Sequence, residues 1–226
     1  MQLAIVVPVL NEAANIPALC AHLQSIAPSA EVVLVDGGST DDTVRLARAE
    51  GMQVVRAPRG RARQMNAGAN ATQAPHLLFL HADTQLPEQA LNLVQDALQQ
   101  RALQHLVWGR FDVRIQGQAK MLRVVAFFMN WRSRLTGIAT GDQAMFMTRQ
   151  AYDKVNGFPN QPLMEDIEMS SALKRISPPI CLRQQVLTSG RRWEQRGVWR
   201  TMVLMWRLRL AYWLGTPAEV LARAYR

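Results

Sequence analysis

Four short apolar runs in the first half of the chain constrain its fold most strongly, because helix-like segments separate each run from the next. The runs span residues 3–10, 31–36, 52–56 and 76–81. Strands that alternate with helices form βαβ units, whose strands run parallel within one sheet. The sequence therefore predicts an α/β fold. Helices are expected over the intervening segments 12–26, 39–51 and 87–101, and residues 60–71 are expected to form a loop that enters a short helix.

The pattern changes after residue 106, where strand-like runs become more widely spaced. Further strands are expected over 107–115, 144–148 and 180–187, and further helices over 119–135, 163–175 and 198–225. The first of these strands alternates apolar and polar residues, which is typical of a half-buried strand. Since 226 residues with 49% apolar content can form one large core, we expect a single α/β domain with a mixed central sheet flanked by helices.

Two acidic positions stand where such a sheet would bind a ligand. Asp36 and Asp83 follow apolar runs, and open α/β sheets bind ligands beyond the carboxyl ends of their strands. Asp36 precedes two glycines and a helix start, a common geometry for contacting a nucleotide, although it would also suit a residue that only caps its own turn. Asp83 is the expected metal ligand, because a hard cation bound to a diphosphate needs only one or two protein carboxylates. The alternative to metal binding is that Asp83 caps the helix that follows.

Two further groups have chemistry that suits phosphate binding and proton transfer. Arg61 and Arg63 lie in an arginine-rich loop, and guanidinium groups match phosphate oxygens; a solvated basic loop is the alternative. Glu165 and Asp166 open the helix expected over 163–175. A carboxylate there suits a general base beside a cleft, but carboxylates at helix starts are also favoured by the helix dipole.

The order of these motifs is more specific than any one of them. Together they resemble the family 2 glycosyltransferases of the GT-A fold. The motifs that carry the resemblance are PVLNE at 8–12, VDGGSTDDT at 35–43, HADT at 81–84 and MED at 164–166. The resemblance implies a nucleotide-diphosphate sugar as donor, a divalent metal (Mg²⁺ or Mn²⁺) and inversion at the anomeric carbon.

The resemblance also implies roles for individual residues. Asp166 would be the catalytic base, with Glu165 beside it, and Asp83 would be the last Asp of the D-x-D metal motif, whose first carboxylate is replaced here by His81. Asp36 would contact the base or ribose. The residues assigned to donor binding are Pro8, Asn11, Glu12, Asp36, Gly38, Arg61, Arg63, His81, Ala82, Arg191 and Arg192. Residues 1–105 would then form the nucleotide-binding half and 106–190 the acceptor and catalytic half, followed by a basic Trp-rich helical segment at 191–226.

A narrower resemblance rests on three more stretches. The segments GRARQMN at 60–66, GDQ at 141–143 and RRW at 191–193 resemble a compact bacterial subgroup labelled as radical-SAM/selenodomain-associated transferases. This resemblance implies glycosyl transfer as the class of reaction but does not identify the acceptor.

Charge is concentrated at the C-terminal end. Residues 1–174 carry 16 Lys and Arg against 15 Asp and Glu, whereas residues 175–226 carry 10 against 2, so +8 of the net +9 lies in the last part. This imbalance indicates an anionic partner. The Trp-rich segment fits a packed helix with a basic edge, an interfacial helix on anionic lipid, or a homodimer contact. An interfacial helix would suit a lipid-linked or otherwise apolar acceptor.

The remaining features narrow the class of protein. The N-terminus has no basic leader or cleavage site and no apolar stretch reaches about 18 residues. We therefore expect a cytoplasmic protein, with a peripheral position on the inner face of the membrane as the alternative. Cys20 and Cys181 read as reduced thiols. Two other functions compete: a sugar-phosphate nucleotidyltransferase, which would need a phosphate loop after the first strand, and a basic nucleic-acid-binding module, for which no motif is present.

Overall fold

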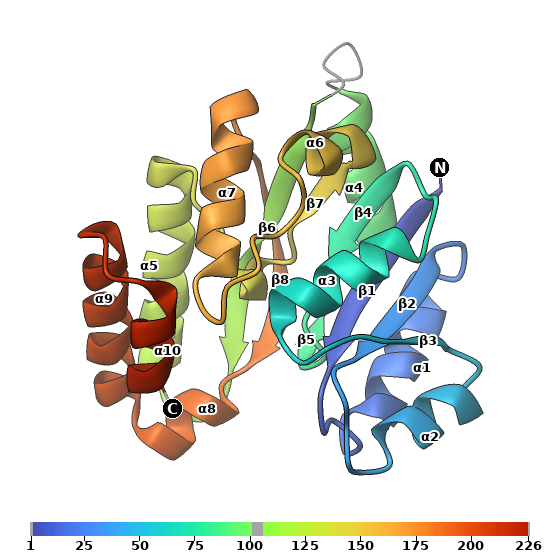
Figure 1. Cartoon of the computed structure of the whole chain (residues 1–226), viewed down its shortest axis with the longest axis horizontal. Coiled ribbons are helices and arrows are strands. Elements are labelled where there is room, and N and C mark those ends of the chain that lie inside the picture. Colours follow the sequence, from blue (N-terminus) through green and yellow to red (C-terminus); the bar gives the residue numbers. More distant parts are fainter. Residues whose placement is uncertain (1, 101–105, 226) are drawn as a thin grey trace.

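The computed structural model describes residues 2–100 and 106–225. Figure 1 shows one sheet with helices on both faces. The strands are β1 (Leu3–Val9), β2 (Glu31–Asp36), β3 (Gln53–Arg56), β4 (His76–Phe79), β5 (Thr84–Gln85), β6 (Trp108–Gln116), β7 (Phe146–Thr148) and β8 (Ile180–Ser189). The helices are α1 (Ile16–Ile26), α2 (Thr43–Ala49), α3 (Arg61–Asn70), α4 (Ala90–Gln99), α5 (Met121–Thr136), the 3₁₀ turn η1 (Gly141–Gln143), α6 (Arg149–Lys154), α7 (Glu165–Ile176), α8 (Arg191–Arg196), α9 (Val198–Trp213) and α10 (Ala218–Tyr225).

The sheet is mixed, as the sequence predicts. Its strand order is β3-β2-β1-β4-β7-β6-β8-β5. The first four strands in this order run parallel, whereas β7 is antiparallel to both β4 and β6, and β5 is antiparallel to β8. The chain leaves β1 toward β2 on one side and reaches β4 on the other, so the strand order reverses at β1. Such a reversal opens a crevice at the carboxyl ends of the strands.

Alternation along the strands builds two apolar layers, one on each face of the sheet. In β1, Ile5 and Val7 join one buried cluster with α1, α4 and α5, whereas Ala4 and Val6 join a second cluster with α3, α6 and α7. Helix α3 approaches the sheet closely at Gly68, where an added Cβ would lie 2.3 Å from Val6 Cγ1. Only a residue without a side chain fits between this helix and β1.

Strand β6 corrects the prediction that 107–115 is half-buried. Its residues from Trp108 to Val113 are all buried, including Arg110 and Asp112, because helices cover both sheet faces there. The two polar side chains alternate with the apolar ones, which produced the half-buried pattern. They form an ion pair with each other, and Asp112 accepts a second ion pair from Arg134 at 2.7 Å. Pairing of the charges is what makes their burial possible.

Several predicted boundaries also change. Helix α1 begins at Ile16 and not at residue 12, because the residues before α1 form hydrogen bonds with the loop after β2 instead. The helix expected over 87–101 is α4, and Arg101 lies outside the described residues. The helix expected over 198–225 is two helices, since Gly215, with a φ of 91°, and Pro217 turn the chain between α9 and α10. The sequence prediction missed β5, α6 and α8, which are all short.

The C-terminal helices pack beside α5 at one end of the molecule. Helices α5 and α9 lie side by side at the left of Figure 1, with α10 in front of them. Helix α9 is tied to α7 and to the loop before it through Tyr212, whose hydroxyl donates to Glu168 Oε2 at 3.1 Å and accepts from Gln161 Nε2 at 3.2 Å. The C-terminal helices therefore pack against α5 and are tied to α7.

Candidate active site

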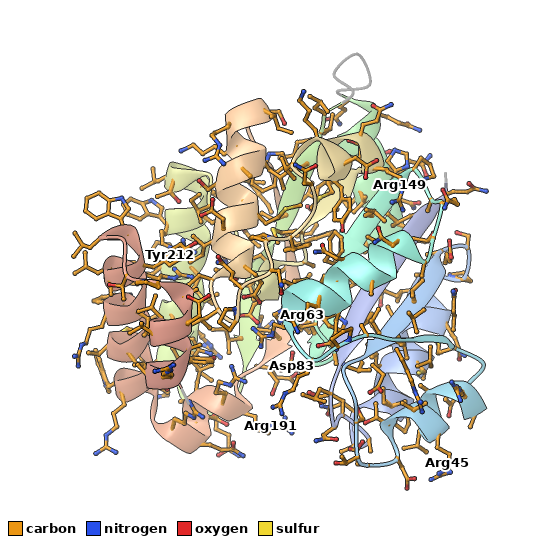
Figure 2. The ribbon with its side chains drawn as sticks, viewed as in Figure 1. Arg45, Arg63, Asp83, Arg149, Arg191 and Tyr212 are labelled. Atoms are coloured by element: carbon orange, nitrogen blue, oxygen red, sulfur yellow. The ribbon has the colours of Figure 1, made fainter. Side chains whose placement is uncertain are left out.

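A cleft of about 550 Å³ opens at the carboxyl ends of β1 and β4. Pro8 and Glu12 line it on the β1 side, and His81, Ala82 and Asp83 line it on the β4 side. The opposite wall comes from α3, α8 and the C-terminal end of α10. Figure 2 shows Asp83 and Arg191 close to the lower opening between α8 and the N-terminal half, whereas Arg45 lies far from the cleft on α2. Of the predicted donor-binding residues, the cleft brings together Pro8, Glu12, Arg61, His81, Ala82, Arg191 and Arg192.

The first two sequence motifs are locked together by hydrogen bonds between their loops. Asn11, with a φ of 53°, donates its N–H to Ser39 Oγ at 2.9 Å and accepts the Thr40 N–H at its Oδ1 at 2.8 Å. The Glu12 N–H donates to Thr43 Oγ1 at 2.8 Å. These contacts hold the loop after β1 against the loop after β2. The structure thus gives Asn11 a loop-fixing position beside the cleft and not among the residues that line it.

Asp36 is buried, and both of its carboxylate oxygens are engaged by its own turn. Oδ2 accepts the Gly38 N–H at 3.2 Å, and Oδ1 accepts the Ser39 N–H at 2.9 Å. Neither Asp36 nor Gly38 lines the cleft. Gly38 has a φ of 93°, which a glycine adopts without strain. The geometry matches the turn-capping alternative, and the role of Asp36 in contacting a nucleotide stays a prediction.

The sequence analysis did not identify Gln64, which anchors the floor of the cleft. Its buried side chain donates from Nε2 to the backbone oxygens of Val9 at 2.9 Å and Val35 at 2.8 Å. These carbonyls are at the ends of β1 and β2. Gly37 contacts the same side chain, since an added Cβ would lie 2.9 Å from it. Gln64 therefore fixes the two strand ends from which the donor-site loops depart.

His81 stands where the resemblance implies the first carboxylate of a D-x-D motif. It stacks on Gly141, whose added Cβ would lie 2.4 Å from His81 Nε2, and its Nδ1 lies 3.2 Å from Asp142 Oδ1. Burial alone would raise the pKa of Asp142, but the hydrogen bond to His81 and the charges of His81, Arg61 and Arg192 lower it. A carboxylate from the turn η1 thus stands next to the position where the family motif normally has one.

The arginines of the predicted phosphate loop divide between two positions. Arg61, at the start of α3, lines the cleft and places Nη1 3.9 Å from Glu165 Oε1. Burial opposes its charge, but the carboxylates of Glu165 and Asp142 raise the pKa of Arg61. Arg63 does not line the cleft and instead donates from Nε to Asn160 Oδ1 at 2.8 Å. Phosphate contact by Arg63 would require it to leave this partner.

A second cavity of about 410 Å³ adjoins the cleft and holds the predicted catalytic pair. Arg61, His81, Asp142 and Arg192 line both spaces. The rest of the second cavity is mostly apolar, although Arg132 of α5 and Arg209 of α9 also line it. Its apolar lining residues are Val125, Phe128, Met129, Trp131, Leu163, Met164, Ile167, Met202, Met205 and Trp206. Charged side chains therefore lie where the two cavities meet and at this pair of arginines.

Asp166 is held by two backbone donors at the start of α7. Its Oδ2 accepts the Gly141 N–H and its Oδ1 accepts the Ile167 N–H, both at 2.8 Å. Met164, in the left-handed conformation with a φ of 64°, turns the chain into the helix. The bond to Gly141 joins α7 to the turn that carries Asp142, so the two carboxylates are held in one hydrogen-bonded unit.

Glu165 is more deeply buried than Asp166. Burial and the adjacent Asp166 raise the pKa of Glu165, although the charge of Arg61 acts in the opposite direction. Two neighbouring carboxylates with unequal environments can hold different protonation states. Both carboxylates line the second cavity, and that of Asp166 is the more exposed and is oriented by two backbone N–H donors.

The residues present fit a divalent cation only if the donor supplies most of its ligands. Among residues 2–100 and 106–225, no cluster of three or more His, Cys, Asp or Glu could hold a metal by itself. Asp83 lines the cleft, and its carboxylate has one long hydrogen bond, from Thr84 Oγ1 at 3.5 Å. Mg²⁺ commonly binds through one or two carboxylates together with phosphate oxygens and water. Asp83 would be the protein ligand.

Comparison with known proteins gives one family and several similar folds. The family model described as Glycosyl transferase family 2 matches residues 4–156. No curated protein matches the sequence significantly. A crystal structure of S. aureus TarS, residues 1–349, is similar with a TM-score of 0.65 and 16% identity, over 84% of this chain and 61% of that one. The chain thus spans about three fifths of that structure.

Two other solved structures share the architecture. The mannosyltransferase PcManGT from Pyrobaculum calidifontis, in complex with GDP-Man and Mn²⁺, has a TM-score of 0.63 and 19% identity, over 99% of this chain and 69% of that one. Glucosyl-3-phosphoglycerate synthase from Mycobacterium tuberculosis, in complex with Mn²⁺, UDP and glucosyl-3-phosphoglycerate, has a TM-score of 0.56 and 20% identity, over 83% and 70%. At these low sequence identities, the similarity is evidence for a shared fold only.

Proposed function

Because the chain belongs to glycosyl transferase family 2, we propose that it transfers a sugar, with inversion, from a nucleoside diphosphate sugar to a hydroxyl of an apolar or lipid-linked acceptor. The family makes the chain a glycosyltransferase and sets aside the nucleotidyltransferase and nucleic-acid alternatives. The observation that carries the proposal is the junction of two cavities: a polar, arginine-rich cleft meets a largely apolar cavity at Arg61, His81, Asp142 and Arg192. The paired carboxylates Glu165 and Asp166 line the second cavity.

The polar cleft is the proposed donor site. Arg61, Arg191 and Arg192 line it and would bind the diphosphate, since guanidinium groups pair bidentately with phosphate oxygens. Three similar structures support a nucleotide donor: S. aureus TarS 1-349 was solved in complex with UDP-GlcNAc, PcManGT in complex with GDP-Man, and glucosyl-3-phosphoglycerate synthase in complex with UDP. A divalent cation held by Asp83 would neutralise charge on the departing diphosphate.

The proposed reaction is a direct displacement at the anomeric carbon. Asp166 accepts the proton of the acceptor hydroxyl while the hydroxyl oxygen forms a bond to that carbon. The bond from the same carbon to the donor's diphosphate oxygen breaks, and the nucleoside diphosphate leaves. Arginines in the cleft stabilise the negative charge that develops on it. Attack from the side opposite the leaving group gives inversion, and the two cavities on either side of Asp142 would supply these opposite approaches.

An apolar face beside the second cavity supports a lipid-linked acceptor and a peripheral membrane position. We define the α5–α9 apolar face as the large apolar side chains that these two helices expose: Val124, Phe127, Phe128, Trp131, Leu135, Trp199, Val203, Trp206, Leu210 and Trp213. Trp213 is 81% exposed. None of the helices in the described part of the chain is long and apolar enough to cross a bilayer. Exposed Trp next to basic residues suits the headgroup region of an anionic membrane.

The donor proposal is tested by the melting temperature of the protein with nucleoside diphosphates, with and without Mn²⁺. A ligand that binds only the native state raises the melting temperature, and 100 times its Kd in free ligand adds about 2.7 kcal/mol of stability. We expect one nucleoside diphosphate to stabilise the protein, and Mn²⁺ to add to its effect. Asp83→Ala should remove the metal increment, whereas the matched control Asp96→Ala on the exposed side of α4 should keep it. Absence of stabilisation by every nucleoside diphosphate would refute the donor site.

A further inference from the structure

The second cavity contains positive charge that the transfer reaction described above does not use. Arg132 of α5 and Arg209 of α9 line it on the side of Asp166, among the apolar side chains. Arg132 Nε and Nη2 are buried, and within the described residues neither atom has a hydrogen-bond partner. A buried guanidinium normally has its donors satisfied, because an unpaired buried donor carries the full cost of its desolvation.

The electrostatics of Arg132 and Arg209 also indicate that an anionic partner is missing. Burial and the nearby positive charges of Arg209 and Arg110 lower the pKa of Arg132 to about 10, although the charge of Asp166 acts in the opposite direction. Burial also lowers the pKa of Arg209, against the attraction of Asp166 and Asp142. Two guanidinium groups from separate helices therefore share one poorly solvated space and repel each other. An anion between them would convert this repulsion into attraction and would provide acceptors for the unpaired donors.

The rest of the cavity limits what such an anion can be attached to. Phe128, Trp131 and Trp206 line the cavity and also belong to the exposed α5–α9 apolar face. Figure 1 shows the two helices that supply them next to each other at the edge of the molecule. The apolar wall is thus continuous from the depth of the cavity to the outer surface. A ligand with an anionic group at depth would have an apolar body extending outward.

We propose that the second cavity binds an amphipathic acceptor in which Arg132 and Arg209 hold a phosphate or carboxylate group and the aromatic wall holds an apolar chain. This inference rests on the proposed transferase function and specifies its acceptor. The acceptor carries the anionic group in addition to the hydroxyl that Asp166 deprotonates. Rotation of the Arg132 side chain toward the anion would satisfy the donors that are unpaired in the free protein.

Calorimetric titration with decyl phosphate, decyl maltoside and inorganic phosphate tests the proposal, since the three probes separate the anion from the chain. We expect decyl phosphate to bind about ten-fold or more tightly than either of the others, because it alone offers both contacts. Equal binding of decyl phosphate and decyl maltoside would overturn the anion subsite. Equal binding of decyl phosphate and inorganic phosphate would overturn the amphipathic acceptor and make a free anion the ligand.

Arg132→Met and Arg209→Met should each weaken decyl phosphate binding by about ten-fold or more, which corresponds to the loss of one charged hydrogen-bonding partner. Arg123→Met and Arg207→Met are matched controls, since these arginines lie on the same two helices, are exposed and do not line the cavity. Arg132→Met should also melt at or above the temperature of the unsubstituted protein, because it removes a partly buried charge whose Nε and Nη2 have no hydrogen-bond partner among the described residues. Unchanged binding in both cavity variants, or equal weakening in the controls, would overturn the proposal.

Parallel titration with nucleoside diphosphates and Mn²⁺ separates this inference from the function on which it rests. If a nucleoside diphosphate binds and decyl phosphate does not, the acceptor inference fails and the transferase proposal stands. If decyl phosphate binds in the Arg132-dependent way and no nucleoside diphosphate binds, the donor site fails and the anion subsite stands.

Discussion

Asp166→Asn tests the proposed base most directly, and the structure changes what this substitution should do to stability. From the sequence, Asn would cap a helix about as well as Asp. In the structure, however, the two carboxylate oxygens accept N–H groups from two different segments, Gly141 and Ile167. An amide has one acceptor oxygen, and its NH₂ group cannot accept. Asp166→Asn must therefore break one of these bonds and leave a backbone donor facing another donor.

The expected stability loss of Asp166→Asn follows from that single lost hydrogen bond. An unsatisfied buried donor costs about 1–3 kcal/mol. For a chain of this length each kcal/mol shifts the melting temperature by roughly 2–4 °C, so a drop of about 2–12 °C is expected. Loss of a general base should lower the rate by about 10²–10⁴. Activity measured well below the melting temperature should thus fall far more than the small loss of folded protein explains.

Ser170→Ala is the matched control for this experiment. Ser170 lies one turn further along α7, where its Oγ donates to the Asp166 backbone oxygen at 2.7 Å and accepts the Ala139 N–H at 3.1 Å. Removing the Ser170 hydroxyl should lower the free energy of unfolding by a similar amount, about 1–3 kcal/mol, without changing the hydrogen bonds of the Asp166 carboxylate. The assay is release of nucleoside diphosphate from the donor, with water or an amphipathic alcohol as acceptor. Asp166→Asn activity within three-fold of the Ser170→Ala activity would refute the base assignment, and Asp142 would become the next candidate.

Three further predictions concern the floor, the catalytic pair and the outer face. Gln64→Leu should lower the free energy of unfolding by about 1–3 kcal/mol in denaturant titrations, because two strand-end carbonyls lose a buried donor; an unchanged midpoint would contradict its anchoring role. The raised pKa of Glu165 means that its stability contribution is present below the unfolded pKa and is lost as pH rises through the folded pKa. Glu165→Gln should therefore melt higher than the unsubstituted protein at neutral pH but not near pH 4, while the exposed control Glu88→Gln should show no such difference. The protein should sediment with anionic vesicles at low salt, and joint replacement of Trp206 and Trp213 by Ser should abolish this; equal sedimentation of the double variant would exclude the apolar face as the contact.

Family membership and the α/β class could be predicted from the sequence because local signals determine them. Apolar runs followed by turn residues fixed the four parallel strands, and β2 has the bounds that were predicted. The motif at 35–43 and the motif at 8–12 were identified separately, and the hydrogen bonds between Asn11 and the Ser39 loop explain why both occur. The mixed sheet and the family were confirmed. The narrower subgroup resemblance and the metal at Asp83 stay predictions.

What only the tertiary structure decided is how residues far apart in the chain share one space. Nothing local marks Gln64 as a bridge between β1 and β2, or separates Arg61, which faces the cleft, from Arg63, which bonds to Asn160. Arg132 appeared in the sequence as one arginine among several on an amphipathic helix. Its unpaired buried donors arise because α9 packs across α5 and brings Arg209 to the same cavity. Periodicity and turn chemistry act over a few residues, whereas desolvation and charge at a site depend on every element that closes around it.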